Sequence, residues 1–453
     1  MTNSGAPKPA AAPPSSAELS IDDLLANGQG VGRLDKLVAF VTGALPGEEV
    51  RAVIEARKPN YLSAHASAIL RPAPERVPSV CPVFPECGGC QVLHLEYAAQ
   101  LAWKRRMLVD ALQRIGGFAG VDVSPAEPSE LIDGTRYRNK VSLEVGPGAP
   151  PAIGFYAARS HRVVRVEQCP VLLPRLNDAV VQFIDLAKRR PQLLDDVRHV
   201  ILRTSATHDR LVLCLSTHRR PALDNALLAA LREHMPALTG IAVSWSPASP
   251  NAIFGRQFQR LWGSDRLIET VCGAQFEFGL TSFFQINSAM LGTIGRELLD
   301  RLRGASRVVD LFCGVGTFAV LLGKVGMSGT GIESDGRAVD EAAANAARNQ
   351  VTRCSFERAG AQEAVAGARG HTLLDGCDAV VLDPPRRGCE PQLLEALARE
   401  RVPRIEYLSC NPATLARDAK ILGAAGYALG VVKPYDMFPH TGHVEALAEF
   451  VLD

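Results

Sequence analysis

The stretch VVDLFCGVGTF, residues 308–318, combines an apolar strand, a glycine turn and the start of an apolar helix. Gly314 and Gly316 let the backbone approach a ligand closely at a helix N-terminus, where unpaired N–H groups collect. The spacing is GxG preceded by Cys313, which disfavours the GxGxxG fingerprint of NAD-binding chains. The succession of strand, turn and helix then repeats to the C-terminus. We therefore expect residues 276–453 to form a Rossmann-like α/β domain with a mostly parallel sheet.

Two further strand ends in this half carry acids. Glu333 follows the apolar strand 329–332, where an acidic side chain can hold the ribose hydroxyls of an adenosine. Asp383 follows the strand 379–382 and precedes two prolines. Each signal alone also fits an ordinary turn with a capping acid, but the three in order are typical of an S-adenosylmethionine-dependent methyltransferase. Enzymes that methylate amino groups follow the double proline with an aromatic ring, so Arg386 disfavours an exocyclic nitrogen acceptor.

A cysteine lies just past an apolar strand in YLSCNPATLARD, residues 407–418. A thiolate that adds to C6 of uracil makes C5 nucleophilic toward a methyl donor, and it also leaves well. The C5 proton must then be removed, and Glu445 is the candidate base. Enzymes that methylate C5 of cytosine usually place the thiol after a proline, but Ser409 precedes Cys410. The plainer interpretation makes Cys410 a small buried hydrophobe and Glu445 a surface acid.

Three cysteines, Cys81, Cys87 and Cys90, fall within ten residues, and Cys169 offers a fourth thiolate. Four soft ligands suit either tetrahedral zinc or an iron–sulfur cluster, and the spacing alone does not decide between them. Incidental buried cysteines are the alternative, which the concentration of a rare residue beside glycine and proline disfavours. We expect a site that supports folding or RNA positioning.

The N-terminal part divides by composition. Residues 1–17 are mostly Ala, Pro and Ser, which predicts a disordered tail. Residues 18–75 alternate short apolar segments with turns, which predicts a small five-stranded β-barrel. Its Arg51 and Tyr61 supply charge and a ring for single-stranded RNA, or equally form a solvated edge.

Residues 76–275 mix strands and helices and are expected to form a central α+β domain. Within them, residues 96–115 repeat apolar positions every three or four residues before a Gly-Gly pair, which predicts a helix. Its basic face, with Lys104, Arg105 and Arg106, either meets phosphate or is simply solvated.

The composition of the 453 residues sets further limits. The net charge of +1 gives no global attraction to polyanions, so any nucleic-acid contact must come from local clusters. No run approaches the roughly 20 apolar residues that cross a bilayer, and the N-terminus lacks the apolar core of a signal peptide. Eleven cysteines, an odd number, fit reduced thiols and metal ligands. A cytoplasmic protein is expected.

These motifs together resemble the RNA uracil-5-methyltransferase family, specifically its 23S ribosomal RNA branch with an N-terminal TRAM barrel and a [4Fe-4S] cluster. The resemblance covers residues 19 to the end and rests on the cysteine pattern and on five segments: SFFQIN (282–287), DLFCGVG (310–316), DPPRRG (383–388), SCNPATLARD (409–418) and FPHTGHVE (438–445).

The resemblance implies a role for each matched residue. Cys410 would be the nucleophile and Glu445 the proton-abstracting base. The residues expected to bind S-adenosylmethionine are Gln285, Phe312, Thr317, Glu333 and Asp383. The expected cluster ligands are Cys81, Cys87, Cys90 and Cys169. Thr317 stands where relatives often have Asn, and Gly360 falls at a position for an adenine-binding polar side chain. The resemblance also implies that the helix within 94–117 packs on the catalytic domain.

The expected substrate is 23S ribosomal RNA, bound before the ribosome is fully assembled, with neither a membrane nor an obligatory protein partner. The transfer RNA branch generally lacks the barrel and the cluster, which favours ribosomal RNA. Transfer RNA remains the nearer alternative, and a noncatalytic metal-containing RNA-binding factor the more distant one.

Overall fold

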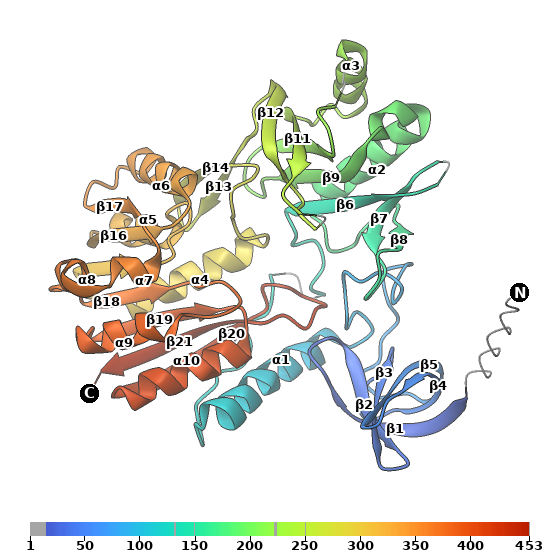
Figure 1. Ribbon diagram of the computed structural model, residues 1–453, viewed down its shortest axis with the longest axis horizontal. Helices are drawn as coiled ribbons and strands as arrows, with labels where there is room; N and C mark the ends of the chain where they lie inside the picture. Colours follow the sequence, from blue (N-terminus) through green and yellow to red (C-terminus); the bar gives the residue numbers. More distant parts are fainter. Residues whose placement is uncertain (1–14, 131–132, 149, 222–223, 250, 453) are drawn as a thin grey trace, which may run out of the picture. The chain divides into compact units, whose positions relative to one another are not determined.

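The computed structural model describes residues 15–130, 133–148, 150–221, 224–249 and 251–452 (Figure 1). The chain divides into two compact units. One comprises Met1–Ser79 and Gln91–Glu96, and the other comprises Val80–Cys90 and Tyr97–Asp453. Among the described residues, no helix has the length and apolar character needed to cross a bilayer.

The first unit is built on a closed five-stranded barrel with strand order β1-β2-β3-β5-β4. Alternate side chains point inward, as strand geometry requires, and build a core that includes Ile21, Val41 and Val50. On the surface Arg51 forms an ion pair of 2.7 Å with Glu18. The strands are β1 (Ser16–Leu24), β2 (Gln29–Leu34), β3 (Leu37–Thr42), β4 (Glu49–Arg57) and β5 (Tyr61–Arg71).

The expected tail, residues 1–17, differs from the structure at its C-terminal end. Residues 1–14 lie outside the described residues. Ser16 and Ala17 belong to β1, where Ser16 pairs with Val53 of β4. The barrel needs this pairing to close, because β1 and β4 are neighbours around it.

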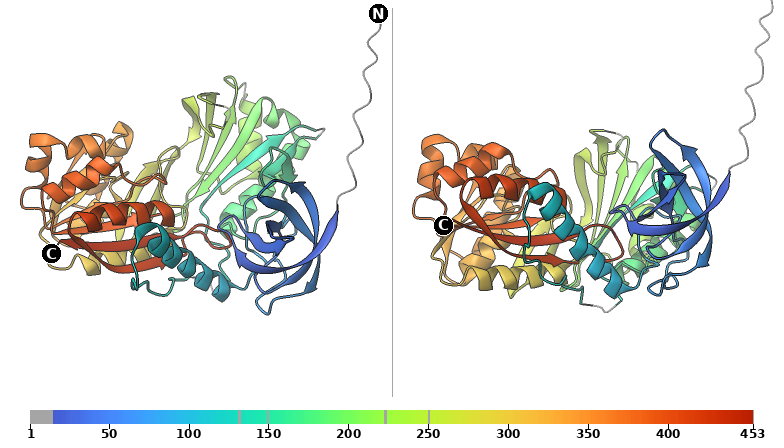
Figure 2. Two further views of the ribbon diagram at one scale, coloured as in Figure 1. Left: turned by 60° about the horizontal axis from the view of Figure 1, so that its bottom comes forward. Right: turned by 90° about the horizontal axis from the view of Figure 1, so that it is seen from below.

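The expected central domain, residues 76–275, is not a unit of its own. Its segment Gln91–Glu96 belongs to the barrel unit, since Glu96 N donates to Glu75 O at 2.8 Å. The helix that follows, α1 (Tyr97–Ala111), continues into a π-helical turn over Leu112–Gly116. Leu108 and Leu112 share one core with Leu415 of the expected catalytic half, the described residues from 276 onward. Figure 2 shows α1 beside this half.

Only part of the basic face expected on this helix is exposed. Arg105 and Arg106 are exposed, but Lys104 has no exposed surface and pairs with Asp436 at 2.5 Å. Residues four apart share one side of a helix, and Lys104 lies between the buried Gln100 and Leu108 on that side. A contact between Lys104 and phosphate is therefore excluded.

The remaining central residues form a seven-stranded sheet with order β12-β11-β10-β9-β6-β7-β8. Two helices, α2 (Pro174–Arg189) and α3 (Asn225–His234), supply the core on one of its faces. The strands are β6 (Lys140–Gly146), β7 (Ala152–Tyr156), β8 (Val163–Arg165), β9 (Val197–Thr204), β10 (Leu211–Thr217), β11 (Gly240–Pro247) and β12 (Gly255–Gly263). A hairpin of β13 (Arg266–Val271) and β14 (Ala274–Gly279) leads into the catalytic half.

The catalytic half is a second seven-stranded sheet with order β17-β16-β15-β18-β19-β21-β20. The first five strands in this order run parallel, and β21 pairs antiparallel with both β19 and β20. The strands are β15 (Arg307–Asp310), β16 (Ser328–Glu333), β17 (Cys354–Arg358), β18 (Ala379–Leu382), β19 (Arg404–Ser409), β20 (Tyr427–Tyr435) and β21 (Glu445–Leu452).

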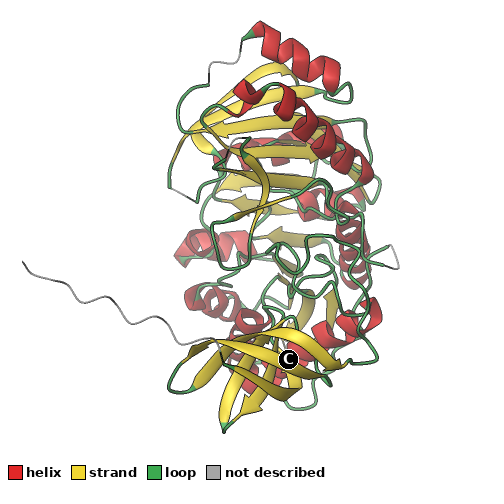
Figure 3. Cartoon of the chain, turned by 90° about the vertical axis from the view of Figure 1, so that its right-hand side faces the viewer, coloured by secondary structure: helices red, strands yellow, loops and turns green. Residues whose placement is uncertain are grey.

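Helices cover both faces of this sheet (Figure 3). One apolar core involves α1, α8, α9 and α10, and the other involves α4, α5 and the β13–β14 hairpin. The strand order reverses between β15 and β18, and ligands of such sheets bind outside the carboxyl ends of the strands at that point. The helices are α4 (Ser288–Arg301), α5 (Thr317–Lys324), α6 (Gly336–Arg348), α7 (Ala361–Ala364), α8 (Gly367–Leu374), α9 (Pro391–Arg399) and α10 (Pro412–Ala424).

Candidate active site

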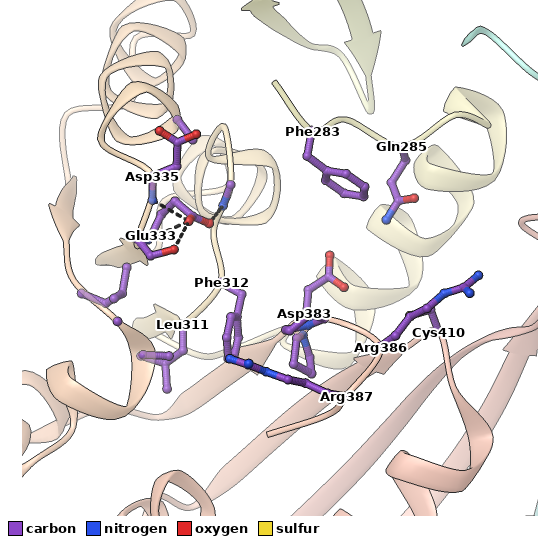
Figure 4. Close-up of a pocket in the computed structure, with 18 of the residues that line it drawn as sticks. Phe283, Gln285, Leu311, Phe312, Glu333, Asp335, Asp383, Arg386, Arg387 and Cys410 are labelled. Atoms are coloured by element: carbon purple, nitrogen blue, oxygen red, sulfur yellow. Dashed lines mark hydrogen bonds between the residues drawn. The ribbon is translucent and has the colours of Figure 1, made fainter. Parts of the chain in front are cut away.

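A cavity of about 720 Å³ opens at the reversal point of the catalytic sheet. Its lining includes most of the residues predicted from the sequence, namely Gln285, Phe312, Glu333, Asp383, Cys410 and Glu445. Gly360 also lines it, whereas Thr317, the first residue of α5, is not among the lining residues. Figure 4 shows Glu333 on one side of the cavity and Cys410 on the other, with Asp383 between them in this view.

The glycine turn after β15 forms one wall. Gly316 has a φ of +84°, and a Cβ atom there would come within 3.0 Å of Ala342, so that both conformation and space require glycine. Asp310 is buried beneath the turn and accepts a hydrogen bond from Ala319 N at 3.2 Å. Burial raises the pKa of Asp310 to about 7, against the lowering effect of its backbone partners. Asp310 thus fixes the turn to α5.

Glu333 is oriented by backbone donors. Its Oε1 accepts from Ser334 N at 2.6 Å and from Asp335 N at 2.9 Å. Its Oε2 accepts from Gly314 N at 3.2 Å, which links the end of β16 to the glycine turn (Figure 4). A carboxylate held in this way can accept hydrogen bonds from the two hydroxyls of a ribose.

The two predicted catalytic residues, Cys410 and Glu445, meet because β21 runs antiparallel to β19. The β19–β21 ladder ends with Ser409 opposite Ala446, one residue before Cys410 on one strand and one residue after Glu445 on the other. The C-terminal end of β19 and the N-terminal end of β21 therefore share an edge of the sheet. This arrangement brings a thiol and a carboxyl into one cavity.

The electrostatics of the pair are set by burial and by neighbouring acids. Burial, followed by the charges of Glu445 and Asp383, raises the pKa of the Cys410 thiol to about 11. Burial and then Asp383 raise the pKa of Glu445 well above its usual value, and Glu445 is only 2% exposed. Burial likewise raises the pKa of Asp383, to about 7, with Asp310 adding to it. A carboxyl with a raised pKa is a strong base once it is ionised.

Arg386 supplies the opposing charge. Its guanidinium lowers the pKa of both Cys410 and Glu445. Nη2 of Arg386 lies 3.1 Å from Nε2 of His443. Burial, together with Arg386, lowers the pKa of His443 to about 4, so the ring is neutral at pH 7 and can accept a hydrogen bond. Arg386 therefore favours thiolate and carboxylate in a site otherwise rich in acids.

Sequence reasoning overlooked the contributions of Arg386, His443 and Phe283 to this site. Phe283 lines the cavity although its side chain is 72% exposed, which suits a stacking surface for a base. Arg386 was visible as the residue after the double proline, and Phe283 as an aromatic beside Gln285. No signal in the sequence placed His443 beside Arg386, because the two residues come from different loops.

The four expected cluster cysteines are neighbours in space. Burial, followed by the charges of Cys169, Cys87 and Cys81, raises the pKa of Cys90. An isolated β-bridge between Cys87 and Ala157 pairs the loop that carries Cys81, Cys87 and Cys90 with the residue that follows β7. Within the residues that the structure describes, however, no three His, Cys, Asp or Glu side chains are arranged to hold a metal ion. The structure shows a group of thiols rather than an assembled metal site.

Comparison with known proteins agrees with this geometry. A family model described as tRNA (Uracil-5-)-methyltransferase matches residues 264–449, and a TRAM domain model matches residues 16–66. An uncharacterized RNA methyltransferase of Listeria innocua is 34% identical over 447 residues, which cover 96% of this chain and 98% of the relative. Another, from Nostoc sp., is 36% identical over 451 residues, 96% of each chain.

One solved structure is similar along its whole length. It is the tRNA (uracil-54, C5)-methyltransferase of Pyrococcus abyssi in complex with S-adenosyl-L-homocysteine, which matches with a TM-score of 0.76 and 28% sequence identity. The match covers 96% of this chain and 100% of that one.

Proposed function

The chain belongs to the RNA uracil-5-methyltransferase family, and we propose that it methylates C5 of a uridine in 23S ribosomal RNA through a covalent bond between Cys410 and the base. The observation that carries this proposal is the meeting of Cys410, Glu445 and Arg386 in the cavity whose other wall is the glycine turn. S-adenosylmethionine supplies the electrophilic methyl group when it is bound there.

The order of events follows from the charges of the site. Arg386 favours the thiolate of Cys410, which adds to C6 of the uracil and pushes an electron pair toward C5. C5 then accepts the methyl group. Glu445 removes the remaining C5 proton, and the electrons left behind expel the Cys410 sulfur. The target base must leave its stack to reach Cys410 in the cavity, and Phe283 is an exposed ring at the same cavity that can receive it.

The acidic residues around the cavity also suit the methyl donor. The four acids that line the cavity, Glu333, Asp335, Asp383 and Glu445, outnumber its two arginines, Arg386 and Arg387, so the free site favours a ligand that carries positive charge. The amino and sulfonium groups of the methyl donor provide such charge. Gln285, Phe312, Glu333 and Asp383 are the residues proposed to contact it, with Thr317 proposed from the family pattern.

A [4Fe-4S] cluster held by Cys81, Cys87, Cys90 and Cys169 is the second part of the proposal. In addition to burial, the charges of neighbouring cysteines help to raise the pKa of Cys87, Cys90 and Cys169, which places these thiols close enough to share one ligand, and thiolates are the ligands of iron–sulfur clusters. The cluster would fix the segment before α1 to the chain after β8 and take no part in the chemistry. Iron and sulfide analysis of anaerobically purified protein tests this, with Cys90→Ser expected to lose the iron.

Transfer RNA is the second candidate substrate. The name of the Pyrococcus abyssi enzyme specifies transfer RNA, and its structure matches 96% of this chain. The unmatched residues are fewer than those of the barrel, so the match includes at least part of the barrel. The barrel therefore does not separate the two substrates, and the ribosomal assignment rests on the cysteine group.

The deciding experiment incubates the enzyme with RNA that carries 5-tritiated uridine and follows tritium release into water. Wild-type protein should release tritium and Cys410→Ala should not, while Glu445→Gln should accumulate a covalent protein–RNA adduct. Mass mapping of ribosomal and transfer RNA then identifies the substrate. A folded wild-type protein that binds the methyl donor but releases no tritium would favour a noncatalytic RNA-binding factor.

A further inference from the structure

The loop between β20 and β21, residues 436–444, forms part of the active site. It brings Phe438 and His443 to the cavity and ends at Glu445, the first residue of β21. Within it His440 has a φ of +65°, a left-handed conformation that costs free energy for a residue other than glycine. Such a conformation persists only where the surroundings hold it, so the loop needs partners outside itself.

Helix α1 provides these partners from more than 300 residues away in the sequence. Lys104 Nζ donates to Asp436 Oδ1 at 2.5 Å and to the carbonyl oxygen of Phe438 at 2.9 Å, with separations of 332 and 334 residues. Gln100 Oε1 accepts from His440 N at 3.0 Å. Gln100 Nε2 lies 3.1 Å from Nδ1 of His440, and burial lowers the pKa of that ring, so the neutral Nδ1 can accept.

Other contacts to the loop come from the segment after the helix. Tyr137 donates its hydroxyl to Pro439 O at 3.3 Å. Gly134, with a φ of +66°, lies so close that a Cβ atom there would come within 2.8 Å of Pro439. Pro439 and His440 therefore contact Gln100, Gly134 and Tyr137, all of which precede β6 in the sequence.

The buried ion pair between Lys104 and Asp436 is not expected to add much to the stability of the fold. Neither Lys104 nor Asp436 has exposed surface, and burial lowers the pKa of Lys104 while Asp436 acts in the opposite direction. Removing two charges from water costs about as much as their attraction returns, so an apolar pair of similar volume would usually be as stable. What an apolar pair cannot supply is a donor at a fixed point for the Phe438 carbonyl oxygen.

We infer that Lys104 and Gln100 are positioning residues for proton abstraction: they hold the loop 436–444 so that Glu445 and His443 face the reacting base. This inference rests on the proposed function, since it assigns Glu445 the second half of that reaction. Cys410 directly follows β19, and the hydrogen bonds of the next residue, Asn411, go to Ser409 and Arg386 rather than to α1. Loss of the α1 contacts should therefore slow the removal of the C5 proton by Glu445 and leave the rate of Cys410 addition to C6 unchanged.

The test compares Gln100→Leu with Gln113→Leu, the same change at an exposed position of the π-helical turn that continues α1. A second variant, Lys104→Met combined with Asp436→Leu, removes both buried charges together and so avoids an unpaired one. Three quantities are measured for each: trapping by 5-fluorouridine RNA, tritium release from ordinary substrate, and hydrogen exchange of the peptide covering 436–444.

Both α1 variants should lose tritium release by about 100-fold, the loss typical of a displacement near 1 Å in a catalytic group. Their 5-fluorouridine trapping should match the wild type, their covalent adduct with ordinary RNA should accumulate, and their loop peptide should exchange faster. Gln113→Leu should behave as wild type throughout. Unchanged tritium release in both variants, or trapping and release falling in proportion, would overturn the inference. A wild-type protein without tritium release would instead refute the proposed function, and the loop exchange would still report whether α1 holds the loop.

Discussion

Asn411 Nδ2 donates a hydrogen bond of 3.0 Å to the carbonyl oxygen of Arg386. This contact joins the residue next to Cys410, the proposed nucleophile, to the loop that carries the Arg386 guanidinium. Asn411 also begins α10, because its Oδ1 accepts from Ala413 N at 3.1 Å. One side chain thus caps the helix that follows Cys410 and fixes the loop that follows Asp383.

The two roles of Asn411 can be separated by Asn411→Asp. Aspartate is an equally good cap, so the helix should be kept, but it cannot donate to the Arg386 carbonyl. Losing a neutral hydrogen bond and placing a second oxygen there costs about 1 to 2 kcal/mol, which should lower kcat about tenfold. Asn411→Ala loses both roles and should also lower the melting temperature. Steady-state kinetics and thermal denaturation of both variants measure this, and equal kcat for wild type and Asn411→Asp would refute the link.

The value of kcat/KM should increase as the pH rises through the neutral range. In the proposed mechanism the reactive forms are the Cys410 thiolate and the Glu445 carboxylate, and both groups have raised pKa values, about 11 for Cys410. Well below its pKa, the thiolate fraction grows tenfold for each pH unit, so log kcat/KM should climb with a slope of about 1 between pH 7 and 9. A plateau at neutral pH would show that the thiol ionises more easily in the free enzyme.

Arg386→Gln should shift this profile to higher pH. The guanidinium lowers the pKa of both Cys410 and Glu445, so its removal leaves less of each reactive form at a given pH. A shift of one pKa unit corresponds to about a tenfold loss of kcat/KM at pH 7.5, and raising the pH should restore part of it. A loss that is the same at every pH would indicate a purely steric role for Arg386.

Phe283 should determine the affinity for RNA. Stacking of a base on an aromatic side chain contributes about 1 to 3 kcal/mol, so Phe283→Ala should raise the KM for RNA at least fivefold. The KM for the methyl donor should change less, and Phe283→Tyr should restore the RNA value because it keeps the ring. Kinetics with each substrate varied in turn measure this. Equal KM values for RNA in wild type and Phe283→Ala would exclude stacking.

Glu333→Gln should weaken binding of the methyl donor. The amide keeps the shape but loses the charge that receives three backbone donors and the ribose hydroxyls, and such charge-assisted bonds contribute about 1.5 to 3 kcal/mol. Calorimetry should therefore show at least tenfold weaker binding of S-adenosylhomocysteine. Glu357→Gln on the neighbouring strand β17, where the acid is exposed, is the matched control and should bind normally. Equal affinities for the two variants would exclude the ribose contact.

Much of the fold could be predicted because its signals are local. An apolar strand, a glycine turn and a helix are consecutive in residues 308–318, and the structure has β15 and α5 there. Likewise, Glu333 is the last residue of β16 and Asp383 directly follows β18. In parallel strands all carboxyl ends share one edge, so local patterns are enough to gather these side chains in one cavity.

The predicted domain boundaries were wrong at positions where pairing between distant segments decides them. The composition around Ser16 predicts a polar tail, but Ser16 pairs with Val53 of β4. The expected central domain includes the segment 91–96, but this segment is hydrogen-bonded to the barrel unit. Neither contact leaves a local pattern, because the partner residues lie far away in the sequence.

The sequence by itself determined the chemistry that this chain can attempt: a thiol after a strand, a glycine turn for the cofactor, and an acid near the C-terminus. Only the tertiary structure decided which groups act together. Glu445 reaches Cys410 because β21 runs antiparallel to β19, and Lys104 is buried against Asp436 because α1 packs on the catalytic half. Strand direction and helix packing are set by the burial of apolar surface across the whole chain, so no single segment could reveal them.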